Sequence, residues 1–298
     1  MQKSFFRTYA HIALLAANLI YGLNFTIAKA VMPVWIKPLA LVSFRSLLTA
    51  GMFWLTSLFL PKEKVSRKDL LFLFGCSFLG VVINQTLFLA GLALTTPINS
   101  SIIMAINPVA AFVFTAWILK EKISLIRGLG LAVGLSGIMI LILHEGKPDL
   151  SSATFVGNIY TLINTLSWAL FTVLIKKMLE KYRPVTVMKW VFTFGMLTNI
   201  PAGYHQWGHM DWAAIPFHAW LGIVFIVIFA TYLGYLLITF GLRRLSPTIV
   251  SGYTYTQPIV AAIVASIMGQ DSLNILKIFS ALLIFTGVFL VSRQQTTS

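Results

Sequence analysis

Ten long apolar stretches constrain what this chain can fold into more than any other feature of its sequence. A helix of roughly 20 residues crosses the hydrocarbon core of a bilayer. Lipid offers no partners to open backbone groups, so each stretch is expected to be a membrane-spanning helix. Prolines, glycines and charged residues separate the stretches and predict turns between them. The predicted spans are residues 9–31, 38–60, 70–92, 97–119, 124–143, 154–176, 184–203, 217–241, 247–268 and 273–292.

The composition argues against a soluble protein. Of the 298 residues, 58% are hydrophobic and 10% are charged, whereas a soluble domain usually carries about 25% charged residues. The mean hydropathy is +0.87. A chain of this length must expose much of its surface, so its apolar surface needs a bilayer as solvent. The spans leave no room for a separate soluble domain, and the sequence has no Walker motif for ATP.

The basic residues predict how the chain is oriented in the membrane. The net charge is +14, and with the N-terminus in the cytoplasm 16 of the 22 Lys and Arg residues fall on the inner side. The outer side holds Lys29, Lys37, Lys147 and Lys277. Cytoplasmic loops are normally the ones enriched in Lys and Arg. We therefore expect a multi-pass protein of the inner (plasma) membrane with both termini cytoplasmic, and the charge requires no nucleic acid as partner.

The second half of the chain repeats the first at a shift of 150 residues. The matches run in order: Gly91-Leu92 with Gly241-Leu242, Thr96-Pro97 with Ser246-Pro247, Ser101 with Ser251, Asn107-Pro108 with Gln257-Pro258, and Gly137 with Gly287. A shift of 147 pairs Tyr21-Gly22 and Lys29 with Trp168-Ala169 and Lys176. Each repeat contains five spans, an odd number, so residues 1–146 and 147–298 are expected to cross the membrane in opposite directions. Inverted repeats are typical of transporters whose substrate site lies between them.

These residues resemble the EamA family of the drug/metabolite transporter superfamily. The resemblance rests on Tyr21-Gly22, Arg45, the segment from Gly91-Leu92 to Pro97, Asn107-Pro108, the turn Lys120-Glu121-Lys122, the glycine-rich fifth span, Trp168-Ala169, Gly241-Leu242, Pro247, Gln257-Pro258 and Asp271. It covers nearly the whole chain. It implies an all-α integral membrane protein whose ten transmembrane helices form two inverted five-helix repeats around a central cavity. It also implies export of amino acids, including aromatic ones, or of other small metabolites.

Polar side chains gather in the first, third, fourth, sixth, eighth and ninth spans, which are equivalent between the repeats. A polar side chain in lipid costs free energy unless it has a partner, so these groups should face the bundle interior or a wet cavity. Uncharged hydrogen-bonding groups mixed with aromatic rings suit a small, partly apolar ligand. Hydrogen bonding between helices is the alternative role. The predicted substrate-binding residues are Asn18, Tyr21, Asn84, Phe88, Ser101, Asn107, Ser167, Trp168, Tyr235, Tyr253 and Gln257.

Two basic residues, Arg45 and Lys189, fall inside spans. Arg45 lies about 9 Å into the second span at the helical rise. Snorkelling toward the membrane surface, or a structural pairing, is the default expectation for both residues. Attraction of a substrate carboxylate is the alternative for Arg45. No acidic residue falls in the middle of a span, so the sequence offers no carboxylate for proton coupling.

Prolines and glycines predict where the helices start, bend and pack. Pro97 and Pro247 are expected at helix starts, where a missing N–H is harmless. Pro108 and Pro258 fall inside the fourth and ninth spans, where proline kinks a helix, so they are predicted either as gating hinges or as static bends. In the fifth span Gly130-x-x-x-Gly134 permits close helix packing, within the chain or in a homodimer.

Taken together, these patterns predict a secondary transporter that exports small metabolites by alternating access. We expect no catalytic residue, metal site or cofactor, and as partners a small-molecule metabolite and the lipid bilayer. An intramembrane lipid-modifying enzyme is the first alternative, and it would need a cluster of His, Asp or Glu near one membrane face. A pore-type facilitator is the second, and it would need a continuous polar stripe along the whole path.

Overall fold

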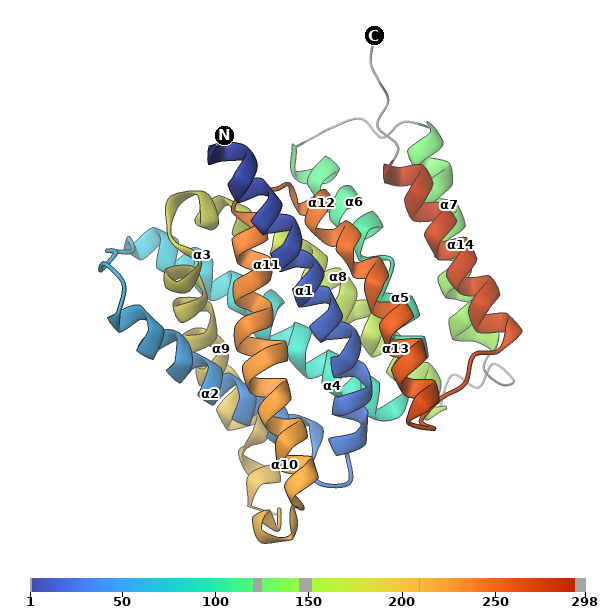
Figure 1. Ribbon diagram of the computed structural model, residues 1–298, viewed down its shortest axis with the longest axis horizontal. Helices are drawn as coiled ribbons and strands as arrows, with labels where there is room; N and C mark the ends of the chain where they lie inside the picture. Colours follow the sequence, from blue (N-terminus) through green and yellow to red (C-terminus); the bar gives the residue numbers. More distant parts are fainter. Residues whose placement is uncertain (1, 120–124, 145–151, 209, 293–298) are drawn as a thin grey trace.

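The computed structural model of the protein describes residues 2–119, 125–144, 152–208 and 210–292, and every regular element among them is a helix (Figure 1). Here η1 and η3 are π-helices, while η2 and η4 are 3₁₀ turns. The predicted turn at 120–122 and the repeat boundary at 146–147 lie outside the described residues. In chain order the elements are α1 (Gln2–Val31), α2 (Pro38–Leu58), α3 (Arg67–Ser77), η1 (Phe78–Ile83), α4 (Asn84–Leu94), α5 (Pro97–Met104), α6 (Asn107–Leu119), α7 (Leu125–His144), α8 (Ala153–Lys181), α9 (Pro184–Trp207), η2 (Trp212–Ala214), α10 (Phe217–Val224), η3 (Phe225–Leu233), α11 (Gly234–Leu242), α12 (Pro247–Gly252), η4 (Tyr253–Tyr255), α13 (Thr256–Ile267) and α14 (Ile275–Ser292).

Each predicted span corresponds to one helix or to consecutive helices in the structure. The third span is α3–η1–α4, the fourth α5–α6, the eighth α10–η3–α11 and the ninth α12–η4–α13. The all-α membrane architecture predicted from the sequence is therefore confirmed. Within the described residues, six segments are by length and hydropathy able to cross a membrane: Thr8–Val31, Pro38–Leu58, Arg67–Leu94, Pro97–Ile118, Ala153–Lys181 and Phe217–Leu242. Shorter apolar helices cover Gly128–Leu141 and Ile275–Gly287.

The predicted helix starts at Pro97 and Pro247 are confirmed, and equivalent residues cap both. Thr96 Oγ1 accepts a hydrogen bond from the backbone N of Asn99 at 3.3 Å at the start of α5. Ser246 Oγ accepts one from Ile249 N at 3.4 Å at the start of α12. A capping hydroxyl followed by proline satisfies the first turn, because proline lacks an N–H that would otherwise need a partner.

The fourth and ninth spans are broken in the middle, at the positions of the inner prolines. After α5 ends at Met104, α6 begins at Asn107, so Pro108 is the second residue of a new helix. Pro258 is likewise the third residue of α13, after the 3₁₀ turn η4. Both prolines therefore lie in a first turn, where the missing N–H disrupts no helical bond. This differs from a kink within a continuous helix, and a hinge motion at these breaks stays a prediction.

Two π-helical segments, η1 and η3, lie at equivalent places in the third and eighth spans. A π-turn carries one extra residue per turn and is frequent at functional sites. In η3, Thr231 Oγ1 donates to the carbonyl oxygen of Ile226, five residues earlier, at 2.6 Å. Gly80 of η1 allows the Phe171 ring of α8 to approach, since a Cβ there would lie 2.5 Å from the ring. Both segments lie beside the cavity described below.

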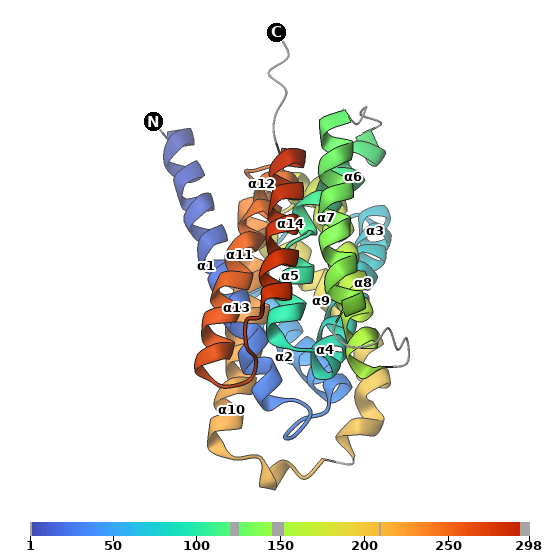
Figure 2. The same cartoon turned by 90° about the vertical axis from the view of Figure 1, so that its right-hand side faces the viewer.

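Equivalent helices of the two halves pack against each other. Helix α2 packs against α9, and α7 packs against α14 at one edge of the bundle (Figure 1); the α7–α14 pair faces the viewer in Figure 2. The α7–α14 contact is very close, because a Cβ on Gly287 would be 2.4 Å from Gly134 N and 2.5 Å from Gly130 O. The predicted Gly130–Gly134 pattern is thus used for packing within the chain. A homodimer stays a prediction.

The centre of the bundle is formed by helices of both halves. Helix α1 packs against α11 and α13, and α8 packs against α4 and α6. Figures 1 and 2 show that α1 begins and α14 ends at the same end of the bundle, as an even number of crossings requires. The outward surface carries large exposed side chains such as Trp117, Phe59 and Ile275, which suits contact with lipid.

Candidate functional site

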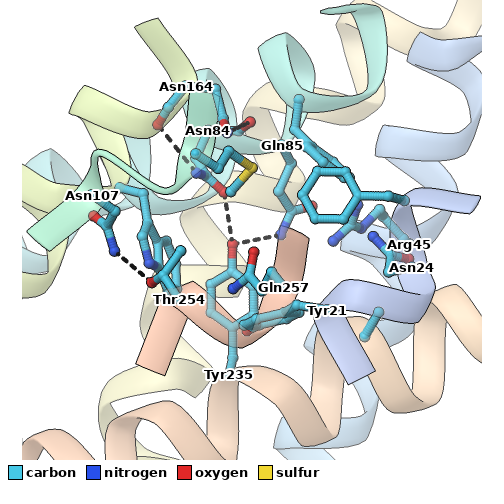
Figure 3. Close-up of a pocket in the computed structure, with 15 residues that line it drawn as sticks. Tyr21, Asn24, Arg45, Asn84, Gln85, Asn107, Asn164, Tyr235, Thr254 and Gln257 are labelled. Carbon is cyan, nitrogen blue, oxygen red and sulfur yellow. Dashed lines mark hydrogen bonds between the residues drawn. The ribbon is translucent and has the colours of Figure 1, made fainter. Parts of the chain in front are cut away.

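A cavity lies between the two halves, and its empty space, counted together with the solvent at its opening, is about 550 Å³ (Figure 3). Most of its lining is buried: Arg45 is 4% exposed, Asn107 2%, Tyr235 3% and Gln257 3%. The lining residues come from both halves and are Tyr21, Asn24, Phe25, Arg45, Asn84, Gln85, Phe88, Met104, Asn107, Asn164, Trp168, Ala230, Tyr235, Thr254 and Gln257.

A hydrogen-bond network around Tyr235 joins the halves at the cavity. Tyr235 Oη donates to the carbonyl oxygen of Gly80 at 2.6 Å and receives a bond from Gln85 Nε2 at 3.2 Å. Gln85 and Tyr235 are equivalent at the shift of 150 and touch each other, so they lie near the axis that relates the halves. Asn164 Nδ2 of α8 donates to the Asn84 carbonyl at 2.6 Å. These hydrogen bonds connect η1 and the start of α4 to α8 and α11.

Amide side chains form the side of the cavity near α6 and α13. Asn107 Nδ2 donates to Thr254 Oγ1 at 3.2 Å, and Gln257 Nε2 donates to Asn18 Oδ1 at 2.7 Å. Asn18 in turn donates to the carbonyl oxygen of Leu14 in its own helix at 2.8 Å. Asn18 lines a smaller void that shares Asn107, Gln257 and other wall residues with the main cavity. The polar path therefore continues from the main cavity toward the first half of α1.

Many polar atoms of the cavity wall have no hydrogen-bond partner in the described structure. A buried donor or acceptor without a partner costs about 1–3 kcal/mol, and native proteins leave few such atoms. Their concentration in one cavity therefore indicates a site that a polar ligand or water fills. The atoms are Tyr21 Oη, Asn24 Oδ1, Arg45 Nη1, Gln85 Oε1, Asn107 Oδ1, Asn164 Oδ1 and Gln257 Oε1.

Aromatic rings form the rest of the wall and hold one another in place. The rings of Trp168 and Tyr235 meet edge to face, with centroids 5.1 Å apart. Phe25 and Phe88 do the same at 5.4 Å. Tyr21 lies directly against Gly234, where a Cβ would come within 2.7 Å of its ring. Edge-to-face pairs are favourable and rigid, so the cavity offers a preformed apolar surface beside its amides.

Lysines hold the helix ends on either side of the cavity. Lys29 Nζ donates to the carbonyl oxygens of Leu92 and Ala93 at 2.9 Å and of Thr95 at 2.8 Å, at the C-terminus of α4. Lys176, its equivalent in the other half, donates to Leu242 O at 2.5 Å and Leu245 O at 3.3 Å, at the C-terminus of α11. A cation is favourable at a helix C-terminus, where carbonyls lack partners. The two caps lie at opposite ends of the bundle (Figure 1).

The structure places most of the predicted substrate-binding residues in the cavity wall. Those in the main cavity are Tyr21, Asn84, Phe88, Asn107, Trp168, Tyr235 and Gln257, and Asn18 lines the adjoining void. Ser101 and Ser167 lie outside the cavity wall. Their hydroxyls donate to the carbonyl oxygens of Ile98 and Leu79, each at 2.7 Å. Tyr253 also lies outside and bonds to His11 Nδ1 at 2.6 Å. Contact of any of these residues with a substrate stays a prediction.

The sequence prediction left out Asn24, Gln85, Asn164 and Thr254, which also line the cavity. Their spacing offered a signal: Asn24 lies three residues after Tyr21, and Asn164 lies four residues before Trp168, so each shares a helix face with a predicted residue. Gln85 follows Asn84 directly, and both line the cavity just after the π-segment η1.

Of the two default expectations for Arg45, the structure shows a pairing and not snorkelling, because the side chain is buried and lines the cavity. Its Nε donates to Thr231 Oγ1 at 3.0 Å. Lys189 behaves differently: it is half-buried at the periphery, with Nζ 4.4 Å from the centroid of the Trp54 ring. A cation over an exposed indole is typical of the membrane interface.

Curated proteins similar to this chain include uncharacterized transporters. The uncharacterized transporter YyaM of Bacillus subtilis (strain 168) is 23% identical over 285 residues, covering 95% of this chain and 93% of the relative. The uncharacterized transporter YetK of the same organism is 24% identical, covering 94% and 86%. A WAT1-related protein of Arabidopsis thaliana is 25% identical, covering 91% and 75%.

A solved crystal structure shares the fold, with a TM-score of 0.67 at 14% sequence identity and 96% of each chain covered. The model of the EamA-like transporter family matches residues 8–143 and again residues 155–293. The two matches together span most of the chain, and residues from both of them line the cavity. The chain therefore belongs to the EamA-like transporter family.

Proposed function

We propose that this membrane transporter is a secondary transporter that exports small metabolites, among them amino acids with aromatic side chains, by alternating access. The observation that carries the proposal is the buried cavity between the halves, whose wall combines rigid rings with polar atoms that lack partners. A substrate that enters this cavity would satisfy those atoms and cover the rings.

The chemistry of the cavity wall supports a small amphipathic cargo. Trp168, Tyr235, Phe25 and Phe88 provide an apolar surface for a ring or aliphatic side chain. The amides provide hydrogen bonds for a polar end. An aromatic amino acid has both parts.

The two lysine caps support alternating access. Lys29 ties the end of α1 to the end of α4, and Lys176 ties the end of α8 to the end of α11. The caps are equivalent in the two halves but lie at opposite ends of the bundle. Breaking one cap while keeping the other would open the cavity to one side only, which is what alternating access requires. The buried cavity, with both caps formed, is in this proposal the occluded state.

The proposal also includes a location: the inner (plasma) membrane, with both termini in the cytoplasm. The inner-side excess of Lys and Arg supports this orientation. It assigns the Lys29 cap to the outer end of the cavity and the Lys176 cap to the inner end.

The test is flux in proteoliposomes that contain the purified protein. Vesicles are loaded with labelled phenylalanine, tyrosine, tryptophan or leucine, and efflux is followed against concentration. We expect saturable efflux of at least one aromatic amino acid, and a drop of at least tenfold for Trp168→Ala, because this ring lies in the wall. Trp117→Ala is the matched control, since Trp117 is 73% exposed on the outward face of α6 and should leave efflux unchanged.

Two results would contradict the proposal. If Trp168→Ala and Trp117→Ala transport at the same rate, the cavity is not the transport site. If no metabolite shows saturable flux from vesicles that hold folded protein, the protein is not such an exporter.

A further inference from the structure

We infer that the cargo carries a carboxylate group and that Arg45 is the residue that recognises it. The inference rests on the proposed transport function and specifies its substrate class. It starts from one property of the cavity: among its lining residues, Arg45 alone carries a full charge.

Arg45 is held so that part of its guanidinium remains free in the cavity. The residue is 4% exposed, and its Nε donates to Thr231 Oγ1 at 3.0 Å. Nη1 is buried and has no hydrogen-bond partner in the described structure. Figure 3 shows the side chain entering the cavity from α2, next to Asn24. A guanidinium fixed at Nε with an open edge is suited to bind a carboxylate, whose two oxygens match its fork of N–H donors.

The described part of the chain gives Arg45 no counter-charge. None of the ion pairs found there includes Arg45. A buried cation without a counter-charge is costly, so the cavity is electrostatically incomplete. The cargo is the group that completes it. The acidic residues that the structure describes all lie in loops or near helix ends, away from the cavity wall: Glu63, Asp69, Glu180, Asp211 and Asp271.

The second half of the chain shows that packing does not require an arginine here. Helix α2 contacts the π-segment η3 through Arg45 and Thr231, and its counterpart α9 contacts the π-segment η1 through Gly195 and Val81. Gly195 packs so closely that a Cβ there would lie 2.4 Å from Cγ1 of Val81. The same contact between a helix and a π-segment is thus built once from small apolar groups and once from an Arg–Thr pair. The polar version is the one whose arginine lines the cavity, so a cargo explains it better than the fold does.

The opposite side of the cavity is uncharged and offers acceptors. Figure 3 shows Arg45 and Asn24 on one side and Asn107 and Asn164 on the other. Oδ1 of Asn107 and of Asn164 lacks a partner in the described structure. A cargo whose carboxylate binds Arg45 would direct its remaining groups toward these amides and the Trp168 ring. Carbonyl oxygens accept hydrogen bonds from an ammonium group, so a zwitterionic amino acid fits. A carboxylic acid without an amino group would still present the carboxylate that Arg45 binds.

The test compares three probes that differ at one group each: phenylalanine, 3-phenylpropionate, which lacks the amino group, and phenylalaninamide, which lacks the carboxylate. Equilibrium binding to the purified full-length protein is measured by quenching of tryptophan fluorescence, and efflux of each probe is measured in proteoliposomes. We expect at least one carboxylate to bind at least tenfold more tightly than phenylalaninamide. The order of phenylalanine and 3-phenylpropionate tells whether the cargo is a zwitterion or a monoanion.

Variants then assign the preference to Arg45. Arg45→Gln should lower the affinity for the carboxylates at least tenfold and remove their advantage over the amide. Arg45→Lys keeps the charge and should retain part of the preference. Thr231→Val removes the Nε partner but not the charge, so it should keep the preference for the carboxylate, and thermal unfolding confirms that each variant is folded. If Arg45→Gln does not fold, Arg45→Lys and the wild-type preference still decide.

Three results would overturn the inference: equal binding of phenylalaninamide and the carboxylates, undiminished preference in folded Arg45→Gln, or no saturable binding of either carboxylate. Failure of the transport proposal would look different. Carboxylate binding that depends on Arg45 without flux would contradict transport and leave the recognition intact. Saturable flux of phenylalaninamide alone would contradict carboxylate recognition by Arg45 and leave the transport proposal intact.

Discussion

Gly287 of α14 gives a direct test of how this bundle is packed. A Cβ at this position would lie 2.4 Å from Gly134 N and 2.5 Å from Gly130 O, whereas ordinary contacts are 3.4–4 Å. Both neighbours are backbone atoms of α7, so no side-chain rotation relieves the overlap and the helices must separate. Overpacking typically costs about 1–3 kcal/mol, and backbone contact places this site at the upper end. Alanine's better helix propensity returns about 1 kcal/mol, so we expect Gly287→Ala to destabilise by about 2 kcal/mol.

Gly128→Ala is the matched control, because a Cβ on Gly128 of α7 would meet nothing within 4 Å. It should be neutral or about 1 kcal/mol more stable, from helix propensity alone. The free energy of unfolding of both variants is measured by denaturant titration in detergent micelles, followed by tryptophan fluorescence. None of the cavity-lining residues comes from α7 or α14, so efflux per folded molecule should stay at the wild-type rate in both. Equal stability of the two variants would refute the close α7–α14 contact.

Two further predictions concern charged side chains at helix ends. Lys29→Met removes the donor to three carbonyl oxygens at 2.8–2.9 Å, so it should favour the outward-open state, whereas Lys176→Met should favour the inward-open state. Side-specific labelling of a cysteine placed in the cavity measures both shifts. The same shift from both variants would contradict the proposal that each lysine closes one end of the cavity. Asp271→Asn removes the carboxylate charge 2.6 Å from Lys277 Nζ, in a pair whose side chains are 4% and 6% exposed. Breaking a buried pair costs about 3–5 kcal/mol, so the free energy of unfolding should fall by about that much; a fall below about 1 kcal/mol would show that the pair is not buried in the membrane-embedded protein.

Hydropathy and charge were sufficient to predict the all-α membrane fold, because spanning a bilayer leaves a chain few options. The breaks inside the third, fourth, eighth and ninth spans were harder. A hydropathy run cannot show where a helix changes to a π-turn, since the change depends on which side chain of another helix occupies the space. Phe171 against Gly80 is such a case, and the two are far apart in sequence.

The candidate cavity was predictable in part for the same reason. Amides and rings in apolar spans must turn inward, and most of the residues selected on that basis line the cavity. Ser101 and Ser167 do not, because a hydroxyl can satisfy itself on a nearby carbonyl and its residue type does not show which bond it will choose. For Arg45 the depth in the span was compatible with either direction. Only the position of Thr231 in three dimensions shows that it turns inward.

The central claim is that cargo occupies this cavity and reaches it from both sides of the membrane. The chain has a single cysteine, the buried Cys76, so Thr254→Cys in a Cys76→Ser background places one reporter thiol in the cavity wall. The rate of labelling by a membrane-impermeant thiol reagent is measured from each side of oriented vesicles, with and without saturating phenylalanine. The account predicts labelling from either side and a slower rate in the presence of phenylalanine. Labelling from one side only, or a rate that cargo does not change from either side, would contradict it.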